Sequence, residues 1–143
     1  MTQTIDDILS DFELFEDWDE RYRYLIDLGR RLEPLPEAAK TEANKVRGCA
    51  SQVWLLTRGI IGNDGRARLG FRGDSDAHIV KGLVALILAL FDGKTPDEIL
   101  ATNAQDVFGK FQLAQHLSAQ RANGVRAMVE RIKAEARAAA ATA

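Results

Sequence analysis

The sequence predicts an α+β protein in which a small antiparallel sheet packs against several helices. Three patterns predict this fold: a β-hairpin signature in the middle of the chain, a long apolar helix after it, and amphipathic helical patterns towards both ends. A length of 143 residues is typical of one folding unit, so we expect a single domain over residues 1–143.

Two helices are expected before the sheet. Thr4 can cap the first, because the carboxylate of Asp7 follows three residues later. The second runs from about Trp18 to Leu32 and is stopped by the prolines after it, which cannot continue the helical hydrogen bonds. A short polar helix or turn follows at 37–42. The apolar faces consist of Ile5, Ile8, Leu9 and Phe12 in the first helix and of Trp18, Tyr22, Leu25, Ile26 and Gly29 in the second.

A β-hairpin is expected next. The run 52–61 is rich in β-branched and aromatic residues, and the Asn-Asp-Gly turn at 63–65 tolerates positive φ. The return run RARLGFRG alternates, so one face of the sheet is expected to be buried and the other wet. Its inward side chains are Ala67, Leu69 and Phe71, and its outward ones are Arg66, Arg68 and Arg72. A third strand could complete the sheet.

A buried helix follows the hairpin. Asp74, Ser75 or Asp76 is expected to cap the segment HIVKGLVALILALF, and Gly93 to end it. This segment is apolar nearly all round, which is typical of a helix at the centre of a domain.

Three further helices are expected towards the C-terminus. The segment TPDE at 95–98 has a capping hydroxyl, proline at the first helical position and a carboxylate three residues after the cap. Another helical stretch lies near 106–111, and Ser118 can cap the last helix. The apolar face of that helix consists of Val125, Met128, Val129 and Ile132.

Composition and charge exclude several classes of protein. Nineteen basic and 21 acidic side chains give a net charge of -2, so neither nucleic acid nor an anionic membrane is expected as a partner. The N-terminus MTQTIDDILSDFELF lacks the basic start and apolar centre of a signal peptide. The longest apolar run, 79–91, is interrupted by Lys81 and falls short of the roughly 20 residues that span a bilayer. A lone cysteine allows no internal disulfide, which fits the cytoplasm that we expect as the location.

The only cysteine, Cys49, lies in VRGCASQVW, just before the first predicted strand. Free cysteine is among the most buried residue types, so residue type alone predicts that Cys49 is a small buried apolar side chain and not a nucleophile. The context favours function, because its small neighbours give the thiol little steric cover and loops often present functional groups. Arg47 and Lys45 could favour the thiolate, the form that attacks other sulfur atoms.

The small number of cysteine and histidine residues excludes several kinds of metal and redox site. A structural zinc site needs about four Cys or His ligands, and the chain has one cysteine and two histidines. An iron-sulfur cluster held by one subunit lacks thiolates for the same reason, and a CxxC oxidoreductase lacks its second thiol. We therefore expect no metal. A cysteine hydrolase with His78 or His116 as its base stays open.

Three motifs resemble those of the SufE-like proteins, the sulfur acceptors of cysteine desulfurases in iron-sulfur cluster assembly. They are RGCASQVW, RGDSDAHIVKGLVALI and LAQHLSAQRANGVRAM, in the family's order, and the resemblance begins at the helix WDERYRYLIDLGRRL. It implies a fold similar to that of the IscU-like iron-sulfur scaffolds. It also implies a persulfide carrier: the motif's cysteine, here Cys49, takes the outer sulfur of a desulfurase persulfide, stimulates that enzyme and passes the sulfur to a scaffold. Pyridoxal phosphate (PLP) belongs to the desulfurase, so no cofactor is expected in this chain.

The resemblance also suggests roles for other residues. The arginine that matches Arg121 is implicated in partner contact in relatives, with helix capping and packing as the alternative. Asp74 could hold the cysteine loop or cap the buried helix, and Arg47 could bind a partner or position the loop. Gly48 could let the loop swing the thiol between a sheltered and an extended position. Gln52, His78 and Lys81 belong to matched motifs without an assigned role.

Several alternatives remain open at this stage. The carrier is expected to act with its desulfurase rather than as a stand-alone enzyme. A non-carrier binding module would stimulate the desulfurase allosterically, and a small thiol hydrolase would turn over an acyl substrate without a desulfurase. A CsdE-like sister-branch carrier would serve a CsdA-like instead of a SufS-like desulfurase and feed other sulfurated products. A monomer and a weak homodimer are equally compatible with the sequence.

Overall fold

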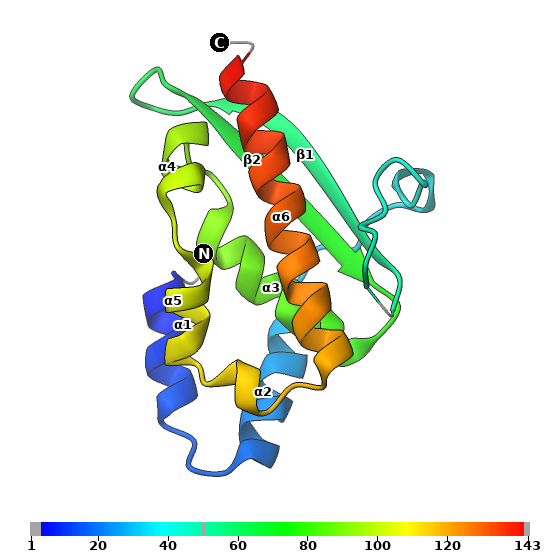
Figure 1. Cartoon of the computed structure of the whole chain (residues 1–143), viewed down its shortest axis with the longest axis vertical. Coiled ribbons are helices and arrows are strands. Elements are labelled where there is room, and N and C mark those ends of the chain that lie inside the picture. The colour runs from blue at the N-terminus through cyan, green and yellow to red at the C-terminus, as the bar shows by residue number, and fades with distance from the viewer. Residues whose placement is uncertain (1–3, 50, 142–143) are drawn as a thin grey trace.

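The computed structural model describes residues 4–49 and 51–141 and shows an α+β fold (Figure 1). This confirms the predicted fold class and the order of helices and strands. In chain order the elements are α1 (Ile5–Glu13), α2 (Trp18–Arg30), the 3₁₀ turn η1 (Glu37–Ala39), β1 (Val53–Ile61), β2 (Ala67–Ser75), α3 (His78–Phe91), α4 (Pro96–Ala101), α5 (Ala104–Lys110), the 3₁₀ turn η2 (Leu113–Gln115) and α6 (Ala119–Ala141).

The first helix begins where its cap predicted. The Thr4 hydroxyl accepts a hydrogen bond from the Asp7 N–H at 3.1 Å, and the Thr4 N–H donates to the Asp7 carboxylate at 3.4 Å. This reciprocal arrangement satisfies two backbone donors that a helix start otherwise leaves unpaired.

Helices α2 and α3 cross at two facing glycines. A Cβ added to Gly29 would lie 2.6 Å from the Gly82 nitrogen, and one added to Gly82 would lie 2.6 Å from the Leu25 carbonyl carbon. The two backbones therefore touch, because glycine has no Cβ to hold them apart. This crossing fixes α3 against the N-terminal helices.

The hairpin pairs in antiparallel register, from Val53 opposite Ser75 to Ile61 opposite Ala67. The possible third strand does not form in the described part of the chain, where the hairpin has only one further contact of this kind, an isolated bridge between Lys45 and Trp54. The Val46 N–H donates to the Val53 carbonyl at 2.8 Å, and the chain then turns away towards Cys49. The bridge holds the chain just before the cysteine loop, of which residues 47–49 and 51 are described.

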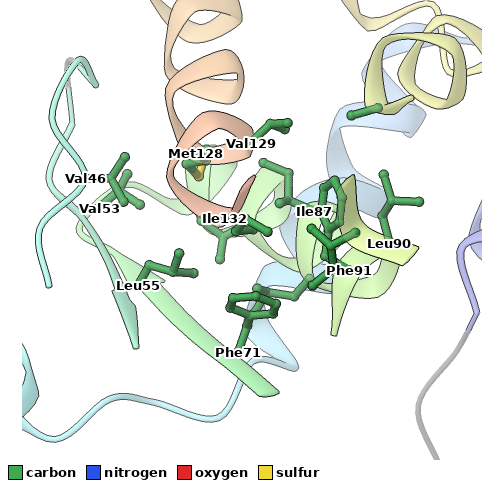
Figure 2. Close-up of a cluster of buried hydrophobic side chains, with 14 of the residues drawn as sticks. Val46, Val53, Leu55, Phe71, Ile87, Leu90, Phe91, Met128, Val129 and Ile132 are labelled. Carbon is green, nitrogen blue, oxygen red and sulfur yellow. The ribbon is translucent and has the colours of Figure 1, made fainter. Parts of the chain in front are cut away.

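The main core lies between the hairpin, α3 and α6. Figure 1 shows α6 lying across one face of the hairpin, and Figure 2 shows side chains from both strands converging with those of the two helices. Leu69 and Phe71 are buried as the strand pattern predicted, and α3 forms the buried centre. Residues of this core include Val46, Val53, Leu55, Phe71, Ile87, Phe91, Met128 and Ile132.

The predicted cap of α3 is wrong. Asp74 and Ser75 belong to β2, and the N-cap position is Ala77, which makes no side-chain capping bond. The strand is longer than predicted because Ser75 still pairs with Val53 at the start of the hairpin. The Ser75 hydroxyl instead accepts a hydrogen bond from the Ala77 N–H at 3.3 Å.

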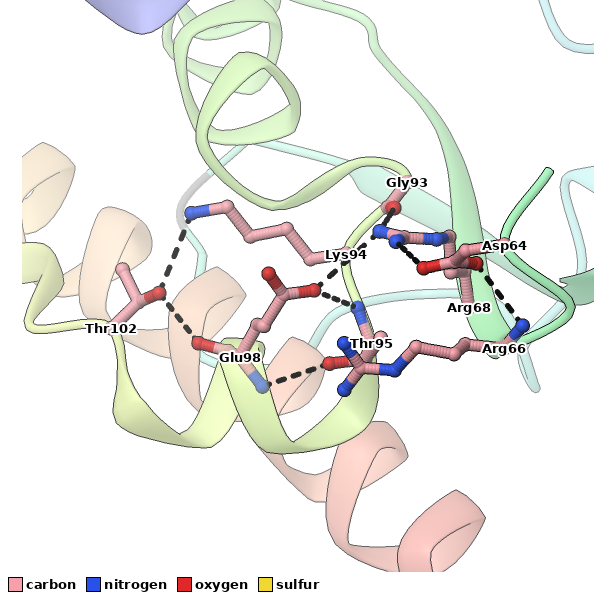
Figure 3. Close-up of polar contacts among 8 residues, drawn as sticks. All are labelled: Asp64, Arg66, Arg68, Gly93, Lys94, Thr95, Glu98 and Thr102. Carbon is pink, nitrogen blue, oxygen red and sulfur yellow. Dashed lines mark hydrogen bonds and ion pairs between the residues drawn. The ribbon is translucent and has the colours of Figure 1, made fainter. Parts of the chain in front are cut away.

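The turn of the hairpin is tied to α4 through Arg68 (Figure 3). Its guanidinium lies 2.8 Å from an Asp64 carboxylate oxygen, donates to the Gly93 carbonyl at 3.0 Å and lies 3.5 Å from Glu98. Glu98 also completes the predicted capping box of α4 with Thr95. These contacts hold the end of the hairpin opposite to the cysteine loop.

Candidate functional site

Cys49 is half-buried against the N-terminal half of α6. Its thiol donates a hydrogen bond to the Gly124 carbonyl, with the sulfur 3.6 Å from the oxygen. A Cβ on Gly124 would lie 3.5 Å from the same sulfur, so the helix backbone forms one wall around the thiol. The preceding residue, Gly48, has φ +92°, a conformation that other residues rarely adopt. The resting thiol is therefore sheltered instead of extended.

The cysteine loop is anchored before the cysteine by α6. The Arg131 guanidinium donates to the Lys45 carbonyl at 3.2 Å and to the Ala43 carbonyl at 2.7 Å. Glu135 accepts from the same guanidinium at 3.1 Å and orients it. Sequence reasoning missed Arg131, because nothing near it in the chain indicates a partner more than eighty residues away.

A second anchor follows the cysteine. The Asp76 carboxylate accepts from the Gln52 N–H at 3.1 Å, and the Ser75 hydroxyl donates to the Gln52 carbonyl at 2.7 Å. Both residues belong to the RGDSD motif at 72–76, so the motif pointed to these positions. They were expected from the sequence to cap α3, and their contact with Gln52 was therefore not predicted. The loop is thus held on both sides while Cys49 itself makes only the bond to Gly124 among the described residues.

A hollow of about 320 Å³ opens beside the thiol, between α3, α6 and the loop. We call it the Cys49 hollow. Its apolar lining consists of Val80, Leu83, Gly124 and Met128, and its polar lining of Cys49, Ser51, Ser118, Gln120 and Arg121.

The structure brings Arg121 to the same hollow as Cys49. Arg121 is exposed and lies in the first turn of α6, where its N–H donates to the Ser118 hydroxyl at 3.2 Å. Ser118 therefore caps α6 as predicted, and the helix start places the guanidinium at the rim. The two residues are far apart in sequence, and the packing of the loop on α6 joins them.

Arg47 and Asp74 lie outside the Cys49 hollow. Arg47 is exposed and lines a shallow depression on another side of α6 together with Arg131. Asp74 is only 4% exposed, accepts from the Leu35 N–H at 3.4 Å and pairs with Lys81 at 3.4 Å. Its contacts hold the segment after α2 to the hairpin. It does not cap α3, and it makes no bond to residues 47–49 or 51, the described part of the cysteine loop.

The remaining motif residues do not reach the thiol. The Gln52 side chain is exposed although its backbone is anchored, and the exposed His78 is the first residue of α3. Lys81 is committed to Asp74. Among residues 4–49 and 51–141, no group of three or more His, Cys, Asp or Glu is arranged to hold a metal ion. No helix in those ranges is both long enough and apolar enough to cross a membrane.

Burial raises the pKa of the Cys49 thiol above its ordinary value. Lys45 and Arg47 were expected to favour the thiolate, but desolvation has the larger effect because neither the Lys45 ammonium nor the Arg47 guanidinium lines the hollow beside the sulfur. The resting side chain is a neutral thiol, in agreement with its hydrogen bond to the Gly124 carbonyl.

Alkylation of Cys49 is expected to follow this raised pKa. Only the thiolate reacts with iodoacetamide, so the rate should rise with pH through a midpoint above that of the denatured chain. The neutral thiol stabilises the fold fully below the ordinary pKa, and this contribution is lost as the pH rises through the folded value. Mass spectrometry of folded and denatured protein across pH measures both midpoints. An equal or lower midpoint for the folded protein would contradict the prediction.

Comparison with known proteins shows the family to which the chain belongs. Residues 6–136 match the family model described as "SufE: Fe-S metabolism associated domain". An uncharacterized SufE-like protein of Rhizobium meliloti (strain 1021) is 53% identical over 133 residues, which cover 93% of this chain and 94% of that protein. A second, from Rhizobium etli, is 50% identical over 138 residues, covering 96% and 93%. The solution structure of a hypothetical protein from Thermus thermophilus shares the fold, with a TM-score of 0.69, 22% identity and 96% coverage of each chain. The chain therefore belongs to the SufE family, which is associated with Fe-S metabolism.

Proposed function

We propose that this protein is a sulfur carrier that accepts persulfide sulfur on Cys49 from a PLP-dependent cysteine desulfurase. By clearing that persulfide it stimulates the desulfurase, and it then delivers the sulfur for iron-sulfur cluster assembly in the cytoplasm. The observation that carries the proposal is the position of the only thiol in the chain, on an anchored loop at the wall of the Cys49 hollow. Membership in a family associated with Fe-S metabolism supports it.

The transfer step needs one thiolate and no further reagent. The Cys49 sulfur attacks the outer sulfur of the donor's Cys–S–SH group, and the new S–S bond forms as the donor's S–S bond breaks. The donor cysteine leaves with the bonding electron pair as a thiolate and takes up a proton. One sulfur atom moves from donor to acceptor, so no outside oxidant or reductant is consumed.

Isolation of the thiol protects the cargo. A second cysteine nearby could attack the Cys49 persulfide, form a disulfide and release the sulfur as sulfide, and this chain has no second cysteine. Gly48 at φ +92° then serves as the pivot about which the partner draws the thiol outward.

Loading of Cys49 tests the proposal. The protein is incubated with a cysteine desulfurase and L-cysteine, trapped with an alkylating reagent and digested. The peptide that contains Cys49 is expected to gain the mass of one sulfur atom before alkylation. The control omits L-cysteine. A peptide that stays unmodified while the desulfurase turns over would refute the carrier function.

A further inference from the structure

The Cys49 hollow is larger than the cargo that Cys49 is proposed to carry. One added sulfur atom needs about the space of a water molecule, roughly 30 Å³ in the liquid. The hollow measures about 320 Å³, which lies within the range of roughly 300–1,000 Å³ typical of small-molecule sites. It therefore has room for a molecule of amino-acid size beside the thiol.

The charge of the residues that line the hollow favours an anionic ligand. Its floor is apolar, with the buried side chains of Val80, Leu83 and Met128. Arg121 is the one charged side chain that lines it in the described part of the chain, and its guanidinium has no hydrogen-bond or ion-pair partner there. A guanidinium binds a carboxylate in a bidentate fashion, so an occupant with a carboxylate would satisfy it.

The start of α6 adds to this preference. Gln120 and Arg121 lie in the first turn of a helix of 23 residues, and the N-terminal end of a helix carries a partial positive charge. The helix end and the Arg121 guanidinium line the same hollow as the Cys49 thiol, which lies against Gly124, three residues further along α6. An occupant that satisfies both groups carries a carboxylate for Arg121 and reactive sulfur for Cys49.

We propose that the Cys49 hollow binds a small thiol bearing a carboxylate, of the size of L-cysteine, and that Cys49 exchanges its persulfide sulfur with this thiol. The inference rests on the proposed function, because it requires a Cys49 persulfide. The small thiolate attacks the outer sulfur, a new S–S bond forms, and the bond between that sulfur and Cys49 Sγ breaks. The electron pair stays on Cys49, which takes up a proton, so Cys49–SSH and RSH give Cys49–SH and RSSH. The reverse reaction loads Cys49 from a small persulfide without a partner protein.

Discharge of the loaded protein tests this exchange. Protein persulfidated on Cys49 is desalted and mixed with L-cysteine or with cysteamine, which has the same thiol arm without the carboxylate. Loss of one sulfur mass gives each rate, and a persulfidated peptide of sequence VRGCASQVW corrects for the intrinsic reactivity of the two thiols. The cysteine-to-cysteamine rate ratio is expected to exceed that of the peptide at least about tenfold, as an interaction of about 1.4 kcal/mol would give. The cysteine rate should also saturate with concentration.

Two arginine variants locate the effect. Arg121→Gln is expected to lower the ratio to that of the peptide. Arg126→Gln is the matched control, because Arg126 is exposed on the same helix, bonds to Asn123 and lines a different groove, so the ratio should stay as in the wild type. Equal thermal unfolding temperatures confirm that both variants fold. A wild-type ratio equal to that of the peptide, or an unchanged ratio in Arg121→Gln, would overturn the inference.

The route of loading separates this inference from the proposed function. One sample is loaded by a desulfurase and L-cysteine, and a second is loaded by inorganic polysulfide. If only polysulfide loads Cys49 and the rate ratio is still high, the desulfurase step fails while the hollow behaves as inferred. If both routes load Cys49 and the ratio equals that of the peptide, the carrier function stands and the small-thiol site is refuted.

Discussion

Replacing Cys49 with serine is expected to abolish sulfur loading completely and to return the desulfurase to its rate in the absence of the protein. Persulfide transfer requires a thiolate that attacks the outer sulfur of the donor, and a serine hydroxyl cannot take this role. The hydroxyl is similar in size to the thiol and can still donate to the Gly124 carbonyl, so the fold should be retained. Mass spectrometry measures loading, and alanine formation measures the desulfurase rate.

The same variant separates a carrier from a regulatory module. If Cys49→Ser stimulated the desulfurase as fully as the wild type, binding alone would account for stimulation and the carrier function would be excluded. A matched control places a thiol elsewhere: Ser10 is exposed on α1, so the double variant Cys49→Ser and Ser10→Cys carries one accessible thiol away from the loop. It is expected not to restore stimulation, because the donor must meet the thiol at the cysteine loop.

Gly82→Ala is expected to cause a large loss of stability for the addition of a single methyl group. The new Cβ would overlap the Leu25 carbonyl group, whose carbon would lie 2.6 Å away. Backbone atoms cannot move aside as a flexible side chain can, so α2 and α3 must separate. We expect a loss of about 3 kcal/mol in the free energy of unfolding, at the upper end of overpacking effects. The unfolding temperature should fall by about 10 °C, measured by circular dichroism or calorimetry.

A second glycine provides the control. Gly59 lies in β1, and a Cβ built there meets no atom within 4 Å. Gly59→Ala should therefore change the free energy of unfolding by less than about 0.5 kcal/mol. If Gly82→Ala were as stable as Gly59→Ala, the close crossing of α2 and α3 would be wrong.

Features decided by neighbours in the chain were predictable from sequence. The capping boxes at Thr4 and Thr95 join groups three residues apart, and each appears in the structure as expected. The hairpin turn, with Gly65 at φ +78°, was equally local. Such features can be predicted because the interacting groups lie within one turn of each other and do not depend on tertiary contacts.

Features that depend on distant partners were not predictable. Asp76 has the residue type of a helix cap, but its carboxylate bonds to the Gln52 N–H because the hairpin brings the two together. The bridge of Lys45 to Trp54 and the anchor by Arg131 had no signal in the sequence. Each of these contacts joins separate segments of the chain that only the fold brings together, so no local pattern predicts it.

The fold class, the order of the elements, the family resemblance and the presence of a single thiol follow from the sequence, because periodicity, caps and the count of cysteines are properties of the chain alone. The folded structure was needed to show that Cys49 is a sheltered neutral thiol, that Arg121 lines the same hollow, and that Arg47 and Asp74 do not. Burial and the meeting of distant side chains arise when the loop packs on α6, and no local pattern encodes that contact.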